Sequence, residues 1–316
     1  MAMWRALTLF CVCLGLSSSL RADQTFAVVQ TARGDGLHLF APVSVNRSKL
    51  KFWLVDTGTP RSLISSAEQR ALGLPYPTFN SGVPQSMYIG GRFEPVVYAQ
   101  SVLTGDFELG PGYFAVADLQ GINNEQTKQA RIAFEKAGLL GTDFLLRHGA
   151  LLNCVTQQMF FPTKGSRLPV TIEGYVQRGF TYIPIRITGK GYPEVAGTIK
   201  GKSYSFLVDT GAAITILKVA IRDQNHLAYQ STPAVTQMPF AGIRNVAVTI
   251  TKLPDFTLGN ADLSNMVVAF GETGRVAASL DFEHEYGGIL GSEFLAHYRA
   301  IIDLGNRALY LKIQRR

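Results

Sequence analysis

A five-residue sequence occurs twice in this chain of 316 residues, once in each half. The segment 54–58 (LVDTG) reappears unchanged at 207–211, and each copy follows an apolar run typical of a buried strand. In each copy the strand ends on an Asp, and the Gly two residues later allows a sharp turn. An ionised Asp at the edge of an apolar core is costly unless it has a partner. We therefore expect Asp56 and Asp209 to meet as a catalytic pair.

The repeat extends well beyond these five residues. Residues 44–58 align with 197–211 at an offset of 153, and 138–145 (GLLGTDFL) align with 288–295 (GILGSEFL) at an offset of 150. The apolar segments 150–161 and 300–311 keep the offset of 150. Insertions collect in surface loops while strands keep their register, so this pattern predicts a duplicated domain with two similar lobes.

The order of these motifs resembles that of aspartic proteases of the retropepsin and pepsin superfamily, with both lobes in one chain. In that family each Asp-Thr-Gly loop is followed by two apolar residues and a Gly, which here are Leu139-Leu140-Gly141 and Ile289-Leu290-Gly291. The resemblance covers nearly the whole mature chain. It implies an all-β, bilobal acid protease fold of the pepsin and retropepsin type, with pseudo-two-fold duplicated lobes and short helices.

The resemblance also implies the chemistry of the pair. Asp56 and Asp209 would share one proton, a known property of this enzyme class that comes with the resemblance. The charged partner would act as general base on a water, and the protonated one would donate to the substrate carbonyl. The proton belongs to the pair, so neither Asp has a fixed role. This mechanism requires no metal, cofactor or covalent nucleophile.

The residues next to each Asp are expected to support the dyad. By analogy with the family, each Thr hydroxyl reaches the backbone of the opposite loop, and each Gly amide faces a carboxylate. The hydroxyl of the residue after the first loop could also bond Asp56, whereas Ala212 after the second loop has none. The supporting residues are therefore Thr57, Gly58, Thr59, Thr210 and Gly211.

The first 22 residues differ from the rest of the chain. Arg5, an apolar stretch and then small residues up to Ala22 form the three zones of a secretory signal peptide. The apolar stretch is shorter than the roughly 20 residues that span a bilayer, so a permanent membrane anchor is the weaker alternative. We expect an exported protein, periplasmic or secreted. The mature chain keeps a single Cys, Cys154, which excludes an internal disulfide and is expected to be inert packing.

Charge and composition exclude several other classes. Apolar residues make up 47% and charged residues 17% of the chain, as in a globular protein with a sizeable core. The formal charge of +7 falls to +5 without Arg5 and Arg21, and no basic stripe indicates nucleic-acid binding. The five His residues lack metal-ligand spacing. Residues 281–285 (DFEHE) could gather a cation, although an exposed polar turn is the preferred interpretation.

The expected organisation is a signal peptide at 1–22, a first lobe at 23–161, a linker at 162–179 and a second lobe at 180–316. Residues 124–137 have helical spacing of apolar residues. Thr142 and Ser292 each precede an acid and Phe-Leu, which predicts that they cap a short helix in each lobe.

Substrate binding is less well defined by the sequence. The segments 81–98 and 231–246 have Gly at probable turns and could form hairpins that cover the cleft. Tyr88 and Phe240 are the candidates for substrate binding, and core aromatics are the alternative for both.

The predicted function is that of an exported aspartic endopeptidase, a hydrolase that acts as a monomer on peptides or proteins. A peptide-binding module that kept the cleft but lost turnover is the alternative. A glycosidase with paired carboxylates would need no duplicated acid loop and fits less well.

Overall fold

The computed structural model describes residues 26–34, 36–78, 81–89, 92–119, 137–163, 170–238, 243–272 and 281–313. The predicted signal peptide at 1–22, all of the predicted helix at 124–137 except Ala137, and Phe240 lie outside these residues. Within the described ranges, no helix is long and apolar enough to cross a membrane.

Each half of the chain folds into a ten-stranded sheet, and the two sheets have the same strand order. In the first lobe nine strands follow the order β6-β7-β10-β5-β11-β4-β3-β8-β9, and β2 pairs with β3. These strands are β2 (Ala32–Arg33), β3 (Leu39–Val45), β4 (Lys51–Val55), β5 (Leu63–Ser65), β6 (Ser86–Ile89), β7 (Arg92–Ala99), β8 (Val102–Thr104), β9 (Phe107–Glu108), β10 (Gly112–Ala117) and β11 (Gly138–Leu140).

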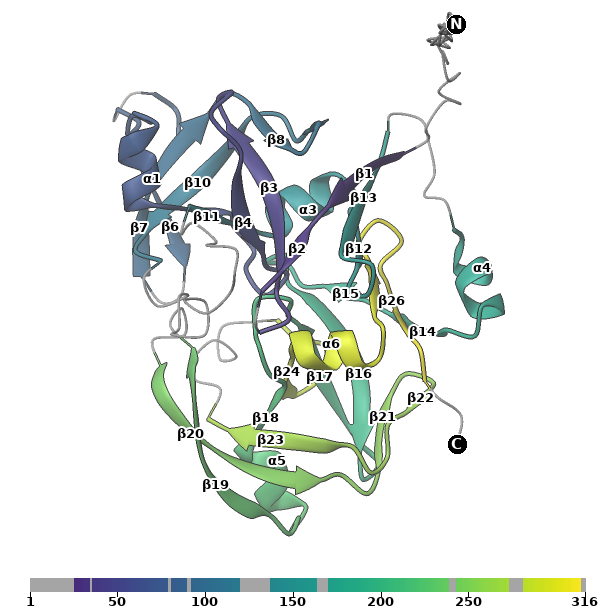
Figure 1. The fold of residues 1–316 in the computed structure, drawn as a ribbon. Coiled ribbons are helices and arrows are strands. Elements are labelled where there is room, and N and C mark those ends of the chain that lie inside the picture. The colour runs from purple at the N-terminus through teal and green to yellow at the C-terminus, as the bar shows by residue number, and fades with distance from the viewer. Residues whose placement is uncertain are drawn as a thin grey trace, which may run out of the picture.

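The second lobe repeats this path as β19-β20-β23-β18-β24-β17-β16-β21-β22, with β15 paired to β16. Its strands are β15 (Arg186–Ile187), β16 (Pro193–Ile199), β17 (Lys202–Val208), β18 (Ile216–Lys218), β19 (Gln230–Met238), β20 (Ile243–Lys252), β21 (Phe256–Leu258), β22 (Ala261–Asp262), β23 (Val267–Gly271) and β24 (Tyr286–Leu290). Strands of the first lobe lie in the upper part of Figure 1 and those of the second lobe in the lower part.

A six-stranded sheet joins the two lobes, in the order β1-β13-β12-β25-β26-β14. Its strands are β1 (Phe26–Gln30), β13 (Gln158–Pro162), β12 (Leu151–Asn153), β25 (Ile301–Asp303), β26 (Ala308–Leu311) and β14 (Thr181–Pro184). The order is symmetric about its centre, where β12 pairs antiparallel with its counterpart β25. The predicted all-β architecture with two duplicated lobes is therefore confirmed.

The described helices are short, six residues each: α1 (Ser66–Ala71), α3 (Thr142–Arg147), α4 (Ile172–Gln177), α5 (Val219–Gln224) and α6 (Ser292–His297). The prediction that Thr142 and Ser292 cap α3 and α6 is wrong. The N-caps are Gly141 and Gly291, without a side-chain cap. The two hydroxyls instead donate to the carbonyl oxygens of Gly191 and Thr210, at 2.7 and 2.8 Å.

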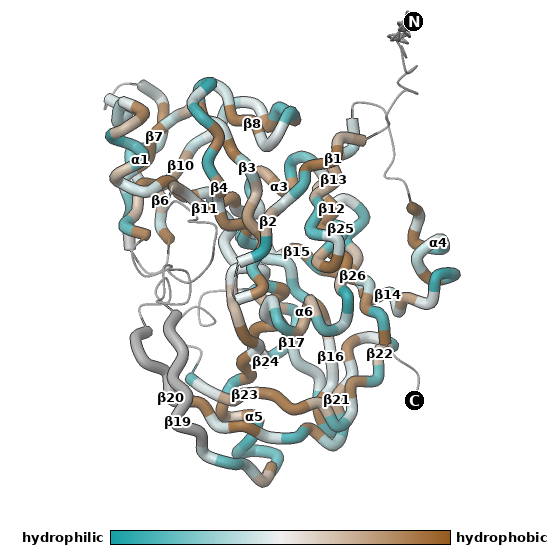
Figure 2. Tube along the Cα trace, in the orientation of Figure 1, coloured by the Kyte–Doolittle hydropathy of each residue, from teal (hydrophilic) through white to brown (hydrophobic). Residues whose placement is uncertain are grey.

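The core of each lobe is built on aromatic side chains that face inward from the sheet. Trp53 packs edge-on against Phe114 in the first lobe, with ring centroids 5.4 Å apart, and Phe206 packs against Phe256 in the second at the same distance. A Cβ at Gly138 would lie 2.4 Å from the Trp53 ring, so this ring requires a Gly there. In Figure 2 apolar stretches run along strands of both lobes, β21 and β24 among them.

The predicted linker at 162–179 contains helix α4, which is followed by β14 of the joining sheet. The predicted lobe boundaries stay a prediction, because strands from both halves share this sheet.

Candidate active site

Each Asp of the repeated pentapeptide lies at the end of a buried central strand. In the first lobe β4 runs parallel to β11, and the Asp56 amide donates to the Leu140 carbonyl oxygen at 3.0 Å. In the second lobe β17 runs parallel to β24, and the Asp209 amide donates to the Leu290 carbonyl oxygen, also at 3.0 Å. The apolar pairs before Gly141 and Gly291 thus pass behind the two Asp loops, as the resemblance implies.

The Gly after each of these apolar pairs is required by close packing. A Cβ at Gly141 would lie 2.8 Å from backbone atoms of Thr59 and Arg61, and one at Gly291 would lie 2.5 Å from the backbone of Ile214. Both contacts are shorter than real Cβ contacts. Any larger residue would therefore displace an Asp loop.

The two Thr residues lock the loops together across the lobe interface. The Thr57 hydroxyl donates to the Val208 carbonyl oxygen at 2.7 Å and accepts from the Thr210 amide at 3.0 Å. The Thr210 hydroxyl donates to the Val55 carbonyl oxygen at 2.7 Å and accepts from the Thr57 amide at 3.1 Å. Both Thr residues are buried. These four reciprocal bonds hold the two Asp loops in a fixed relation.

The carboxyl groups of Asp56 and Asp209 are hydrogen-bonded to each other. Each also accepts a bond of 2.8 Å from the amide of the Gly in its own loop, Gly58 or Gly211. Burial raises the pKa of both carboxyl groups, and the neighbouring Asp56 charge raises the pKa of Asp209 further. The geometry therefore favours a pair that holds one proton, with one group charged and the other neutral.

The two carboxyl groups have unequal surroundings. The Thr59 hydroxyl donates to Asp56 Oδ2 at 2.8 Å. Asp209 instead accepts a second amide bond from Ala212 at 3.0 Å. Since a hydroxyl donor favours the charged carboxylate, Thr59 lowers the pKa of Asp56 against the effect of burial.

Replacement of Thr59 by Ala is expected to move the acidic limb of the pH–activity profile to higher pH. Without this donor the pKa of Asp56 rises, so the charged partner forms only at higher pH. Peptide cleavage measured from pH 3 to 7, a window around the dyad's expected titration, would show the shift. Thr198→Ala removes a hydroxyl that bonds Thr257 in β21 and serves as control. An unchanged acidic limb in Thr59→Ala would contradict the assigned role of Thr59.

Two residues that the sequence did not single out as site residues also lie beside the dyad. Burial raises the pKa of Tyr192 to about 12, and the nearby charges of Asp56 and Asp209 add to the rise. Burial lowers the pKa of His38, and the nearby backbone of Gly211 partly opposes this fall. The strand registers pair Ala32 with Phe40 and Arg186 with Glu194, which makes His38 and Tyr192 counterparts at an offset of 154. Residues 34–40 and 188–194 share no residue type at this offset, so the sequence repeat does not reveal this pair.

Of the two aromatic residues predicted to bind substrate, the structure describes Tyr88 but not Phe240. Strands β6 and β7 pair antiparallel in the first lobe, as β19 and β20 do in the second. Tyr88 lies on β6 with 62% of its surface exposed, and its ring meets that of Phe93 edge-on at 5.2 Å. The core alternative for Tyr88 is therefore wrong, while its contact with substrate stays a prediction. Phe240 lies outside the described residues.

The acids at 281–285 do not converge. Asp281 accepts from the Gly189 amide at 2.9 Å, and Glu285 pairs with Lys202 at 2.8 Å. In the described part of the chain no group of three His, Cys, Asp or Glu residues could hold a metal ion. The preferred interpretation of this segment as a polar turn agrees with these contacts.

One comparison with known proteins, the family match over the second lobe, agrees with this geometry. Residues 195–294 match the family model described as aspartyl protease. Among solved structures, an aspartic proteinase from Irpex lacteus aligns with 90% of this chain and 96% of its own, at 15% identity and a TM-score of 0.49. A search of the curated proteins found no match. The family match spans Asp209 and the second apolar-Gly motif, so the resemblance to aspartic proteases is confirmed for this part of the chain.

Proposed function

We propose that this protein is an exported aspartic endopeptidase that hydrolyses peptide bonds with a water held between Asp56 and Asp209. The observation that carries the proposal is the carboxyl pair, in which two acids 153 residues apart are hydrogen-bonded to each other in buried surroundings. The aspartyl protease match over residues 195–294 supports a protease function independently.

The reaction follows from the protonation state of the pair. The charged carboxylate takes a proton from the water, which attacks the carbonyl carbon of the scissile bond. The protonated carboxyl donates to the carbonyl oxygen, and the result is a tetrahedral diol. The carboxyl that received the water proton then gives it to the amide nitrogen. The C–N bond breaks, and one diol hydroxyl returns its proton to the other carboxylate, which leaves the pair with one proton. The reciprocal Thr bonds keep both acids in place through these steps, which limits the reorganisation that the reaction needs.

The proposal also includes export of the protein and a monomeric state. Residues 1–22 have the zones of a secretory signal, which supports a periplasmic or secreted enzyme. Both acids come from one chain, so the pair forms without a second subunit, which supports a monomer acting on peptides or proteins.

The test is digestion of a peptide library by the mature wild-type protein between about pH 3 and 7, a window around the dyad's expected titration. Cleavage at defined peptide bonds, with new amino and carboxyl termini seen by mass spectrometry, is the expected result. Peptides that are bound and released intact at every pH would instead show the peptide-binding module. Addition of a chelator is expected to leave cleavage unchanged, since the proposed chemistry uses only the carboxyl pair and water.

A further inference from the structure

Each lobe sends one turn across the interface to the other lobe. In the first lobe, residues 34–38 join β2 to β3, and a Cβ at Gly36 would lie 3.2 Å from Ala213 Cβ in the second lobe. In the second lobe, residues 188–192 join β15 to β16, and the Gly191 carbonyl accepts from Thr142 of the first lobe at 2.7 Å. The two turns are counterparts, and in the second Tyr192 packs in the same apolar cluster as Leu207 and Ala212, which flank Asp209.

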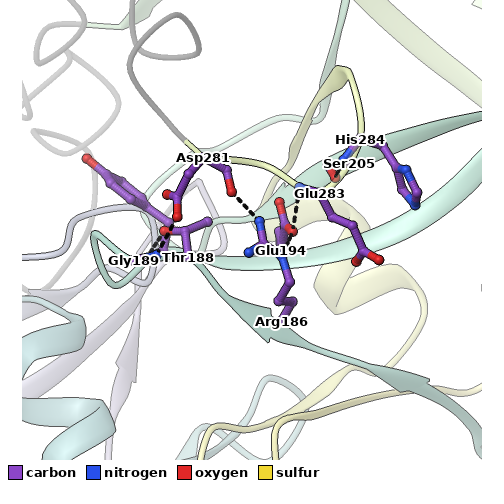
Figure 3. Close-up of polar contacts among 9 residues, drawn as sticks. Arg186, Thr188, Gly189, Glu194, Ser205, Asp281, Glu283 and His284 are labelled. Atoms are coloured by element: carbon purple, nitrogen blue, oxygen red, sulfur yellow. Dashed lines mark hydrogen bonds and ion pairs between the residues drawn. The ribbon is translucent and has the colours of Figure 1, made fainter.

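Only the second of these turns has an ionic support among the described residues. The Asp281 carboxylate accepts from the Gly189 amide at 2.9 Å, and Arg186 donates to the Asp281 carbonyl oxygen. Within the turn, the Tyr192 amide donates to the Thr188 hydroxyl at 3.0 Å. Figure 3 shows Asp281 between Arg186 and Gly189, with Thr188 beside Gly189.

A buried carboxylate anchors this support. Glu194 is 1% exposed, and its Oε1 accepts from Arg186 and from the Glu283 amide, the latter at 3.1 Å. Its Oε2 is buried without a hydrogen-bond partner among the described residues. Burial of a carboxylate costs free energy unless hydrogen bonds replace its contacts with water. In Glu194 only Oε1 has such hydrogen bonds among the described residues.

The first lobe shows that the strand pairing does not require these charges. Arg186 and Glu194 face each other across β15 and β16, and the corresponding pair across β2 and β3 is Ala32 and Phe40. The same pair of strands thus forms with apolar residues in one lobe and with an ion pair in the other. The Arg186–Glu194 pair therefore has a role other than strand pairing. Because Arg186 also bonds Asp281, and Asp281 bonds Gly189, we infer that this role is to hold the 188–192 turn.

We propose that Arg186, Glu194 and Asp281 form a positioning cluster that holds the 188–192 turn against the dyad, so that the Tyr192 hydroxyl donates a hydrogen bond to the bound peptide. The proposal rests on the proposed endopeptidase function and adds a residue to it. Tyr192 keeps its proton throughout the acidic and neutral range because burial and the two carboxylates hold its pKa near about 12. It acts there as a neutral donor, and its counterpart His38 makes the two sides of the dyad chemically different.

The test transplants the apolar pair of the first lobe into the second, as the variant Arg186→Ala/Glu194→Phe. Of this pair only the Glu194 side chain is buried, and that of Arg186 is 38% exposed. Replacement of a buried carboxylate and its partner by apolar residues is commonly neutral or stabilising, so the variant is expected to keep or raise Tm. Its KM for a cleaved peptide is expected to rise about 3- to 10-fold, the range of one lost hydrogen bond, with little change in kcat. Tyr192→Phe alone is expected to raise KM by the same factor. The triple variant Arg186→Ala/Glu194→Phe/Tyr192→Phe should have a KM no higher than that of Tyr192→Phe or of the double variant.

The matched control is Lys202→Met, which removes an exposed ion pair to Glu285 next to the same segment and should leave KM unchanged. If the double variant does not fold, Asp281→Ala removes the Gly189 contact from the surface and carries the same expectation. A folded double variant with wild-type KM would overturn the cluster's role. So would a triple variant whose increase in KM is the product of the increases in the double variant and in Tyr192→Phe. A wild-type protein that cleaves no peptide would refute the endopeptidase itself, whatever the variants do.

Discussion

Asn in place of either Asp56 or Asp209 is expected to lower kcat for peptide cleavage by about a thousandfold or more, within the range for loss of general acid–base catalysis. Asn cannot exchange the proton that the pair must both accept and donate. The two single variants are expected to be equally inactive because the acids work as one unit. Steady-state cleavage of one library-derived peptide by wild type and both variants measures the effect.

The exposed acid Asp262 offers a control, since Asp262→Asn removes a carboxylate that bonds only within its own turn. It should keep full activity. Cleavage that persists in Asp56→Asn or Asp209→Asn would exclude the dyad as the catalytic centre.

Stability should change in the opposite direction to activity in these variants. Burial raises the pKa of both carboxyl groups above the ordinary value of 3.8, so the folded state favours their protonated forms. The resulting stabilisation is present below the unfolded pKa and is lost as pH rises through the folded pKa. At neutral pH the Asn variants, which carry no charge there, should therefore unfold at a higher Tm than the wild type. The difference should shrink toward pH 3, and a lower Tm would indicate that inactivity came from misfolding.

Ala in place of Gly58 or Gly211 is expected to abolish activity and to destabilise the fold. A Cβ at Gly58 would lie 2.2–2.5 Å from the carboxyl atoms of Asp209, and one at Gly211 would lie 2.3–2.5 Å from those of Asp56. Each Gly therefore makes room for the acid of the opposite lobe. The added methyl must push the carboxyl groups apart, at a cost of about 1–3 kcal/mol for overpacking.

Gly73→Ala separates this steric effect from a general effect of losing a Gly. Gly73 has φ +61° and nothing within 4 Å of its Cβ position, so Ala there costs only about 1 kcal/mol of backbone strain. It should lower Tm slightly and leave kcat unchanged. Chemical denaturation and peptide cleavage measure both effects, and active Gly58→Ala protein would contradict the close approach of the two loops.

The residues of the dyad could be predicted because the duplication repeats them. Asp56 and Asp209 occur in identical segments, and the resemblance to aspartic proteases places such segments together at the axis between the lobes. The reciprocal Thr bonds, whose partners are backbone atoms of the opposite loop, were predicted by the same resemblance. The repeat therefore identified the residues, and the resemblance supplied their contacts.

The parts that differ between the lobes could not be predicted in this way. Arg186 and Asp281 are 95 residues apart and have no repeat to connect them. The capping prediction failed for a related reason. The hydroxyls of Thr142 and Ser292 donate to the carbonyl oxygens of Gly191 and Thr210 instead of capping the helices. No local sequence pattern reveals these tertiary contacts.

The symmetric joining sheet has a consequence for the origin of the chain. At its centre Leu152 of β12 lies opposite Ile302 of β25, and Leu151 and Asn153 face Asp303 and Ile301 in antiparallel register. Because β12 and β25 are copies of one another, this edge is self-complementary, and a polypeptide of half the length carries everything needed to close the sheet with a second identical molecule. The present chain is then a covalent version of a two-fold homodimer. The covalent link allows the two halves to differ, with Ala212, Tyr192 and the Arg186–Glu194 pair in one half and Thr59, His38 and an apolar strand pair in the other. Two identical subunits cannot differ in this way.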